Sequence, residues 1–301
     1  MTMKKVTTDR LYLEVYSDLY EFIDTINERP VNEAFVKYYG ANNQSSHEEG
    51  DKHSYAYKFT GTCTWDESVR LMEGGWSEGV KLIENAGGMK GHASSFEFKT
   101  DIVGCTPCIP NAIMGLPNSM LNISEQKKQK SEVTIIYMIG AHHKINKREL
   151  AAASRKLLDA ICSIERSGTR VKLMVGKCNC EGKYASNNYN IACLFPLKQA
   201  DQPINLMKMS YPLVHPSFFR RQIFRWQETL PYDFGGCEKL VAGHGYSLVD
   251  NNSFKQDLVK MRIIKPTDII VNFYELDRCY EAENVLELLK KQNKELKTEV
   301  A

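Results

Sequence analysis

The sequence predicts an α/β protein built on a mostly parallel sheet that is flanked by helices. Val133–Ile139 is a nearly continuous apolar run, which is typical of a strand buried on both faces. Lys147–Ser167 follows with apolar residues at helical spacing, and Gly168 is suited to end that helix. Val171–Val175 then predicts a second strand. Because strand, helix and strand in this order form a βαβ unit, we expect the two strands to be parallel.

Composition excludes several classes of protein. A hydrophobic share of 43% with 25% charged residues is ordinary for a globular chain and argues against wholesale disorder. The 39 basic residues nearly balance the 37 acidic ones, so the overall charge gives no reason to expect a nucleic-acid coat or a membrane-surface protein. Apolar runs such as Val133–Ala141 are far shorter than the roughly 20 residues of a membrane span. Met1–Asp9 is followed by no apolar stretch of the kind in a secretory signal, so we expect a cytoplasmic protein.

The N-terminal part predicts a mixture of helices and a strand. Asp18–Glu28 has the apolar spacing of an amphipathic helix. In Tyr55–Phe59 aromatic residues alternate with Ala and Lys, which favours a short strand. Thr64 with Glu67 three residues later forms a capping-box pattern, which predicts the start of another helix. Ser77 is suited to begin a further short helix.

A segment rich in Gly, Pro and Cys separates this part from the first buried strand. Glu97–Val103 is compatible with a strand, and Gly104–Pro117 is expected to be a structured loop. The lysines in Lys127–Lys130 are interpreted as a solvated linker, with phosphate contact as the minor alternative.

The last third predicts further strands and two helices. A helix is expected from Pro216 onward. A charged helix is expected at Tyr280–Lys297. Its apolar residues keep a heptad spacing only in part, which leaves oligomerisation through this C-terminal helix open. We divide the chain into an α+β N-terminal region (1–130), an α/β core (131–275) and the C-terminal helix (276–301). The strands expected after Val175 are Tyr189–Pro196, Ile204–Met209, Lys239–Val241, Arg262–Ile264 and Asp268–Phe273.

The nine cysteines are interpreted as free thiols, because we expect no secretory signal and therefore a reducing compartment. Two pairs are close in sequence, Cys105 with Cys108 and Cys178 with Cys180. Four thiolates could hold a zinc ion, and the first pair has the spacing of a redox motif. Neither pair has the surroundings usual for these functions, so structural thiols are the favoured interpretation.

The order of elements resembles a von Willebrand factor A-like Rossmannoid fold over Val133–Phe273. Four short motifs also resemble those of an uncharacterised family carried by tailed bacteriophages and prophages: Phe59–Trp65, Gly74–Gly79, Gly115–Met120 and His215–Arg221. The resemblance implies a phage-encoded protein in the cytoplasm of a host cell. It narrows the origin more than the mechanism.

The resemblance does not carry over the metal site of the A-domain class. Metal-binding members place Asp-x-Ser-x-Ser after the first strand, where carboxylate and hydroxyl oxygens hold a hard divalent ion. The corresponding segment, Met138–His143, contains neither Asp nor Ser. We therefore expect no metal-dependent adhesion site of this type.

A His/Cys cluster is the sharpest metal hypothesis. His142 and His143 follow the first strand of the βαβ unit, and Cys178 and Cys180 follow the second. Carboxyl ends of parallel strands share one sheet edge, where ligand crevices form. The four side chains could together bind zinc. The alternative, which we favour, is that they are unligated and that the protein has no cofactor.

A second candidate cluster lies on the helix after Pro216. His215, Arg220, Arg221, Arg225 and Trp226 combine basic and aromatic side chains that can bind single-stranded nucleic acid. Two other interpretations are a core position with paired arginines, and a protein interface, where Trp and Arg are frequent hot spots. We favour core and interface over nucleic acid.

These observations predict a phage or prophage accessory protein that binds another macromolecule, most plausibly a protein, with no catalysis inferred and no membrane partner. The sequence has no glycine-rich phosphate loop and no hydrolase or zinc-finger motif. The alternative is a metal-dependent or nucleic-acid-processing factor that uses His142 and His143 with the helix containing Arg220–Arg225.

Overall fold

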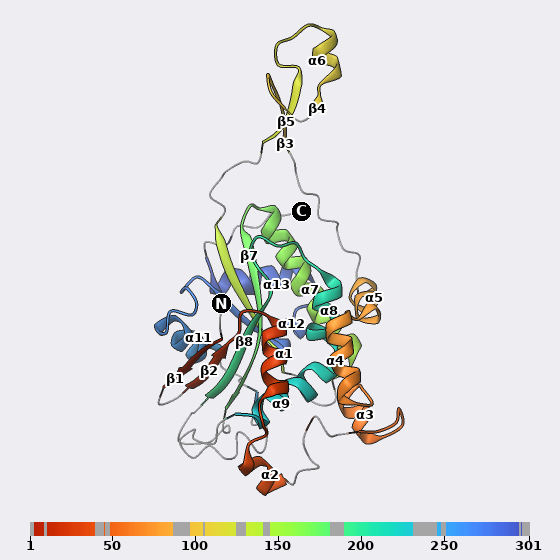
Figure 1. Cartoon of the computed structure of the whole chain (residues 1–301). Coiled ribbons are helices and arrows are strands. Elements are labelled where there is room, and N and C mark those ends of the chain that lie inside the picture. The colour runs from red at the N-terminus through yellow and green to blue at the C-terminus, as the bar shows by residue number, and fades with distance from the viewer. Residues whose placement is uncertain are drawn as a thin grey trace. The chain divides into compact units, whose positions relative to one another are not determined.

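A computed structural model of the chain describes residues 3–8, 11–39, 45, 49–86, 97–104, 106–124, 131–140, 145–180, 190–230, 246–247, 251–294 and 296. The chain forms two compact units, residues 1–89 with 132–301 and residues 90–131. We call the first the core and the second the insert (Figure 1).

The core is α/β and is built on one sheet with helices packed on it. Its pairings β2–β8, β7–β6 and β6–β10 are parallel, and β1–β2, β8–β7 and β7–β9 are antiparallel. The sheet order is β1 (Lys4–Thr7), β2 (Leu11–Val15), β8 (Asn190–Lys198), β7 (Arg170–Cys180), β6 (Glu132–Met138), β10 (Ile269–Asn272), with β9 (Tyr246–Ser247) beside β7.

The predicted βαβ unit is confirmed. β6 and β7 are parallel, with Val133 opposite Val171, and α7 (Lys147–Arg166) connects them. Asn146 starts α7 by accepting hydrogen bonds from the main-chain N–H groups of Arg148 and Glu149. The predicted final strand is also confirmed as β10, which pairs in parallel with β6.

Both faces of the sheet are covered. On β6, Ile135 packs in a large cluster with α1 and α7, and its neighbour Ile136 packs in a second cluster with α11. This explains why the strand has no polar alternation. Helices that contribute to the large cluster include α1 (Leu19–Glu28), α7, α8 (Leu206–Val214), α9 (Ile223–Glu228), α12 (Phe273–Asp277) and α13 (Ala282–Gln292); α11 is Asn251–Lys260.

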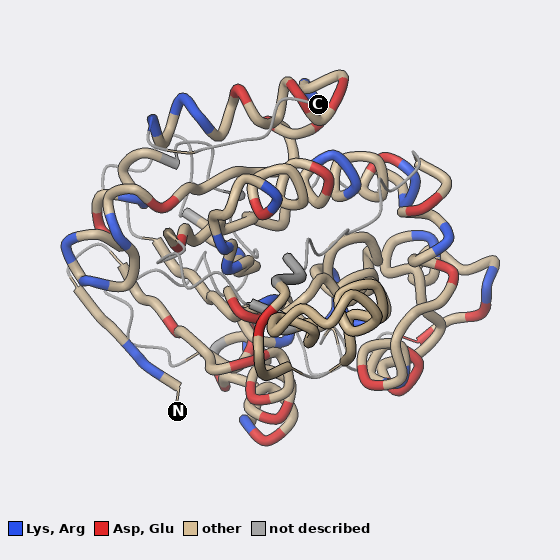
Figure 2. The backbone as a smooth tube through the Cα atoms, turned by 90° about the horizontal axis from the view of Figure 1, so that it is seen from above, with Lys and Arg blue, Asp and Glu red and all other residues tan. Residues whose placement is uncertain are grey.

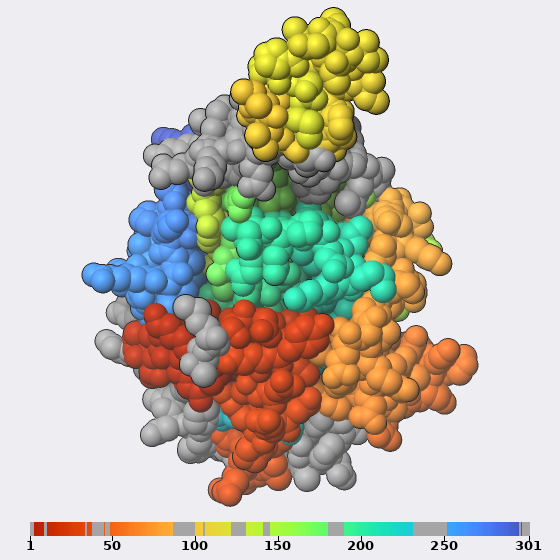
Figure 3. Space-filling view, turned by 45° about the horizontal axis from the view of Figure 1, so that its top comes forward, coloured from red at the N-terminus to blue at the C-terminus, as the bar shows by residue number. Residues whose placement is uncertain are grey.

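The N-terminal part belongs to the core and is not a separate region of residues 1–130. β2 inserts between β1 and β8, and its pairing of Leu11 with Asn190 joins segments distant in sequence. Such pairing leaves no local sequence pattern, so the division at residue 130 differs from the structure. The other helices of this part are α2 (Glu33–Tyr39), α3 (Tyr55–Thr60), α4 (Trp65–Gly74) and α5 (Ser77–Asn85), and Figure 3 shows α4 and α5 beside α8.

The strand predicted at Tyr55–Phe59 is wrong, because these residues form α3. Ser54 caps the helix by accepting a hydrogen bond from the N–H of Tyr57, and Gly61 ends it with a φ of 80°. Tyr55 and Phe59, one helical turn apart, stack with ring centroids 6.4 Å apart. A helix of six residues is too short to show its own period, so the alternation of its aromatic residues resembles that of a strand.

Two further strand predictions are also wrong. Ile204–Met209 overlaps α8, which begins after Asn205 and continues through Pro212. Arg262–Ile264 is a turn after α11, where Arg262 has a φ of 54°. The strand predicted at Lys239–Val241 lies outside the described residues.

The C-terminal helix α13 packs on its own chain. Val285 and Leu289 are fully buried in the large cluster, so the apolar face considered for oligomerisation is covered within the chain. The side-chain amide of Gln292 bonds to both the N–H and the carbonyl of Ile270 on β10, at 3.1 and 2.7 Å. None of the helices in the described residues combines the length and apolar composition of a membrane span.

In its described residues the insert contains a small antiparallel sheet of order β3-β5-β4 and one short helix. The strand predicted from Glu97 is β3 (Glu97–Asp101), paired with β5 (Met120–Ser124). The predicted loop Gly104–Pro117 holds β4 (Thr106–Pro107) and α6 (Ile109–Ile113). Lys127–Lys130 lies outside the described residues.

Candidate functional site

The predicted arginine cluster is turned into the core. It lies on a π-helix, η2 (Phe218–Gln222), that continues into α9. Arg221 is fully buried and donates from Nε to Thr62 Oγ1 at 2.8 Å, from Nη2 to the Thr62 carbonyl at 3.0 Å and from Nη1 to the Ser45 carbonyl at 3.1 Å. Its guanidinium therefore holds the N-terminal segment against the π-helix.

The two neighbouring arginines act in the same way. Arg220 is buried between the rings of Phe59 and Phe219 and donates to the Phe59 carbonyl at 2.5 Å, and its burial lowers its pKa to about 10. Arg225 donates from Nε and Nη2 to the carbonyls of Ile26 and Arg29 at 3.4 and 3.3 Å. Three guanidinium groups thus bind main-chain carbonyls in the last turn of earlier helices or in the segments after them, so they hold parts of the same chain together.

His215 is buried and neutral. Its Nδ1 accepts a hydrogen bond from the N–H of Ser217 at 3.1 Å, and its ring lies between those of Trp76 and Tyr211, with centroids 4.6 and 5.1 Å away. Burial, with the nearby Lys147 charge, lowers the pKa of His215 to about 3. It also packs against the end of α3, since a Cβ on Gly61 would lie 3.1 Å from its Cε1.

A buried carboxylate that the sequence reading missed joins this region to the sheet. Glu14 on β2 accepts hydrogen bonds from Tyr12 at 2.5 Å, Arg29 at 2.9 Å and Trp226 Nε1 at 2.8 Å, and from Tyr16. Burial raises its pKa, but the hydrogen bonds from Arg29 and the tyrosines outweigh burial and leave the pKa below its usual range. The signal in the sequence is the alternation of Tyr12, Glu14 and Tyr16, which puts all three on one face of a strand.

The proposed His/Cys metal cluster is only partly described. Cys178 is buried in the smaller cluster opposite Ala192, and the main chain of Cys180 pairs with Asn190. His142, His143 and the side chain of Cys180 lie outside the described residues. Within the described residues no group of three or more His, Cys, Asp or Glu side chains could hold a metal ion. Both the zinc hypothesis and the favoured interpretation without a cofactor stay untested at His142, His143 and Cys180.

The cysteines in the described part of the chain are free thiols. Burial raises the pKa of Cys162 to about 11, and it raises the pKa of Cys193 further. Such thiols are protonated near neutral pH and are poor nucleophiles. Cys108 of the predicted redox pair is described, whereas Cys105 is not.

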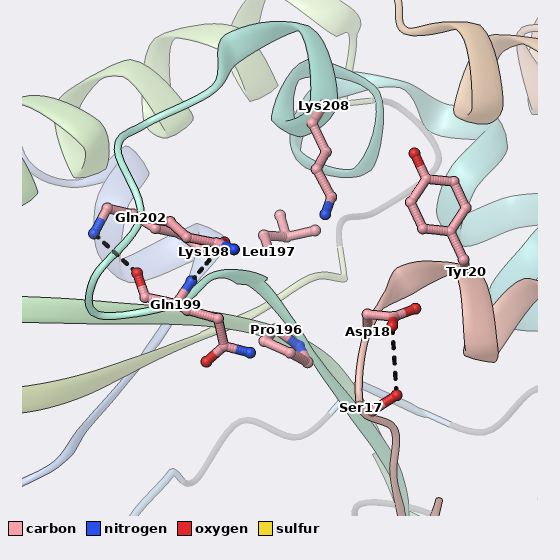
Figure 4. Close-up of a pocket in the computed structure, with 9 residues that line it drawn as sticks. All are labelled: Ser17, Asp18, Tyr20, Pro196, Leu197, Lys198, Gln199, Gln202 and Lys208. Carbon is pink, nitrogen blue, oxygen red and sulfur yellow. Dashed lines mark hydrogen bonds between the residues drawn. The ribbon is translucent and has the colours of Figure 1, made fainter. Parts of the chain in front are cut away.

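A small polar cavity of about 240 Å³ lies where the parallel strands β2 and β8 end (Figure 4). Its charged groups are already used: Asp18 caps α1 at the N–H of Glu21, and the buried Lys198 bonds to Glu165 at 2.5 Å and to the Val171 carbonyl. Lys208 lies over the Tyr20 ring at 5.5 Å. Ligand pockets are usually larger, about 300–1,000 Å³, and mostly apolar.

The insert exposes an apolar face. Within the described residues, six of the seven exposed large aliphatic side chains lie there, and Met207 is the other. Their exposed fractions run from 45% to 80%, and we call these six residues the apolar face: Ile102, Val103, Ile109, Ile113, Met114 and Leu116.

The apolar face is held by hydrogen bonds within the insert. The N–H of Cys108 donates to the Ser119 carbonyl at 2.7 Å, and that of Leu116 to the Asn111 carbonyl at 2.9 Å. The Asn111 side chain donates to the Asn118 carbonyl at 2.9 Å. Gly115 has a φ of 67°, which suits glycine at the turn after α6. The face is therefore preformed.

The sequence contains a signal for this face that motif analysis does not detect. The 23 residues Ile102–Ser124 contain no Asp, Glu, Lys, Arg or His. Elsewhere acidic and basic residues are interspersed over the helices of the core (Figure 2). The apolar face is therefore the candidate site that the described residues support best.

A family model described as a domain of unknown function (DUF7192) matches residues 4–296. The chain belongs to this family. The matched range includes both the core and the insert, so the apolar face lies inside the DUF7192 domain. No curated protein matches the chain, and no solved structure does.

Proposed function

We propose that this DUF7192 protein acts by binding another protein chain through the apolar face of the insert, and that it does so without catalysis. The observation that carries the proposal is the grouping of six exposed aliphatic side chains on one charge-free segment. Monomeric proteins rarely expose large contiguous apolar patches unless these bind something.

Burial of the apolar face is a sufficient driving force for association. Covering one large aliphatic side chain contributes about 1.5–3 kcal/mol, and the face offers six of them. Because hydrogen bonds inside the insert already fix the turn after α6, little further ordering is required on binding. The insert alone is too small to cover these residues, since a unit of this size buries little of its own surface.

A protein partner fits the surface better than nucleic acid does. Phosphate contacts need lysine or arginine, and Ile102–Ser124 contains neither. The arginines considered for nucleic acid, Arg220, Arg221 and Arg225, donate to carbonyls inside the core. His142 and His143, considered for a nucleic-acid or metal function, lie outside the described residues.

The test is affinity capture with a tagged full-length chain. We expect Ile113→Asp to lose the captured partner, because it puts a charge on the most exposed side chain of the apolar face. Ile113 is 80% exposed, so the substitution should not disturb folding. The matched control is Tyr280→Asp, which places the same charge at a 94% exposed site in the core. Equal capture by wild type and Ile113→Asp would contradict the proposal.

We also propose, from the resemblance of the motifs, that the chain is a tailed-phage or prophage protein of the host cytoplasm. The parallel arrangement β10-β6-β7 with α7 between two of its strands supports the von Willebrand A-like interpretation of the core. The genes that flank members of this family test the origin. Flanking genes without phage relatives would argue against it.

A further inference from the structure

We propose that the partner of the apolar face is a second copy of the same chain, so that the protein forms a symmetric dimer through the insert. This inference rests on the proposed function, because both require the face to bind protein, and it adds the identity of the partner.

The absence of charge favours self-association. In a twofold dimer the same surface meets itself, so each charged group near the axis faces its own counterpart. Like charges brought together in an interface are unfavourable. The chain as a whole is 25% charged, but Ile102–Ser124 carries no charged residue. This segment can therefore meet its own copy without repulsion.

The types of side chain disfavour the other partners. Interfaces with a different protein commonly use Trp, Tyr and Arg as hot spots, with complementary charges that give specificity. Segments that enter a membrane surface commonly combine aromatic with basic residues. Ile102–Ser124 contains no aromatic residue, no Lys and no Arg. An aliphatic, uncharged surface instead has the composition of homodimer interfaces, which are more apolar than others.

The geometry of α6 supplies a surface that can pair with itself. Ile109 and Ile113 are four residues apart and share one side of the helix, with exposed fractions of 67% and 80%. No residue of α6 is buried within the described part of the insert. Asn111, the polar residue between them, uses its side-chain amide inside the insert. Two copies of α6 packed together would cover both isoleucines and leave that hydrogen bond intact.

The experiment is analytical ultracentrifugation of the purified full-length chain from low to high micromolar concentration. We expect the mass of two chains for wild type. Ile113→Asp should raise the dimer dissociation constant by at least about tenfold, because an apolar contact is replaced by two facing carboxylates. Tyr280→Asp should dimerise as wild type does. Equal near-ultraviolet circular dichroism of the three proteins checks that all are folded.

Two results would overturn the inference: a wild-type chain that stays monomeric throughout, or an Ile113→Asp chain that dimerises as tightly as wild type. A monomer whose captured partner is lost on Ile113→Asp would refute the dimer and retain the proposed function. A monomer that instead sediments with vesicles of phosphatidylcholine and phosphatidylserine, and loses this on Ile113→Asp, would refute both.

Discussion

At the scale of single residues, Glu14 connects three parts of the core. Its carboxylate lies on β2 and accepts hydrogen bonds from Tyr12 and Tyr16 on the same segment, from Arg29 after α1 and from Trp226 on α9. A buried carboxylate is unfavourable unless its oxygens are bound. Here Arg29 balances its charge. Trp226, which the sequence analysis offered as a binding residue, thus serves this cluster.

Glu14→Gln is expected to lower the free energy of unfolding by about 3–5 kcal/mol, because Arg29 loses the carboxylate that balances its charge. The side-chain NH2 of glutamine would also face groups that themselves donate hydrogen bonds. Urea unfolding measures this, and Glu28→Gln on the exposed face of α1 is the control.

The same residue predicts a pH dependence. Since the pKa of Glu14 is lowered on folding, its contribution to the free energy of unfolding is full above the usual pKa range of a glutamate, and it is lost as the pH falls through the pKa of the folded state. The difference between wild type and variant should therefore shrink in acid; a constant difference would contradict this.

At the scale of elements, the sequence predicts the strands and helices whose length or ends are marked by a recognisable residue pattern. Buried apolar length identified β6, and Gly168, which has a φ of 91°, marked the end of α7. Short runs were ambiguous: Tyr55–Phe59 was read as a strand but is a helix between Ser54 and Gly61. The π-helix η2 could not be predicted, because the contacts that stabilise its wide i→i+5 turn are tertiary. They are the hydrogen bonds of Arg220 and Arg221 to distant segments, which a local sequence pattern does not show.

The edge strand β10 gives a prediction about elements. Gln292 on α13 bonds to both main-chain groups of Ile270 and so takes the place of a neighbouring strand. Gln292→Met is expected to lower the free energy of unfolding by about 1–3 kcal/mol, because a partly buried N–H and carbonyl lose their partners. Lys291→Met, at the exposed neighbouring position, is the control. Equal urea midpoints for the two variants would show that Gln292 does not protect this edge.

At the scale of the whole molecule, local patterns could not reveal how distant segments meet. The predicted parallel β6 and β7 are confirmed, but β2 joins the same sheet through β8, far away in sequence. The apolar face was missed for a different reason. Its residues form no motif, and their significance depends on exposure, which a sequence does not contain. The charge-free run Ile102–Ser124 was visible, but without structure it reads equally well as core.

Separation into two units predicts that the core folds without the insert. Among the described residues, neither apolar cluster of the core contains one from 90–131. Replacing Lys90–Ser131 with a flexible Gly/Ser linker between Met89 and Glu132 should therefore change the free energy of unfolding by less than about 1 kcal/mol, since a shorter closed loop costs little entropy. The same variant should sediment as a single chain. Loss of cooperative unfolding would show that the insert stabilises the core, whereas a folded variant that still dimerises would place the contact between copies in the core.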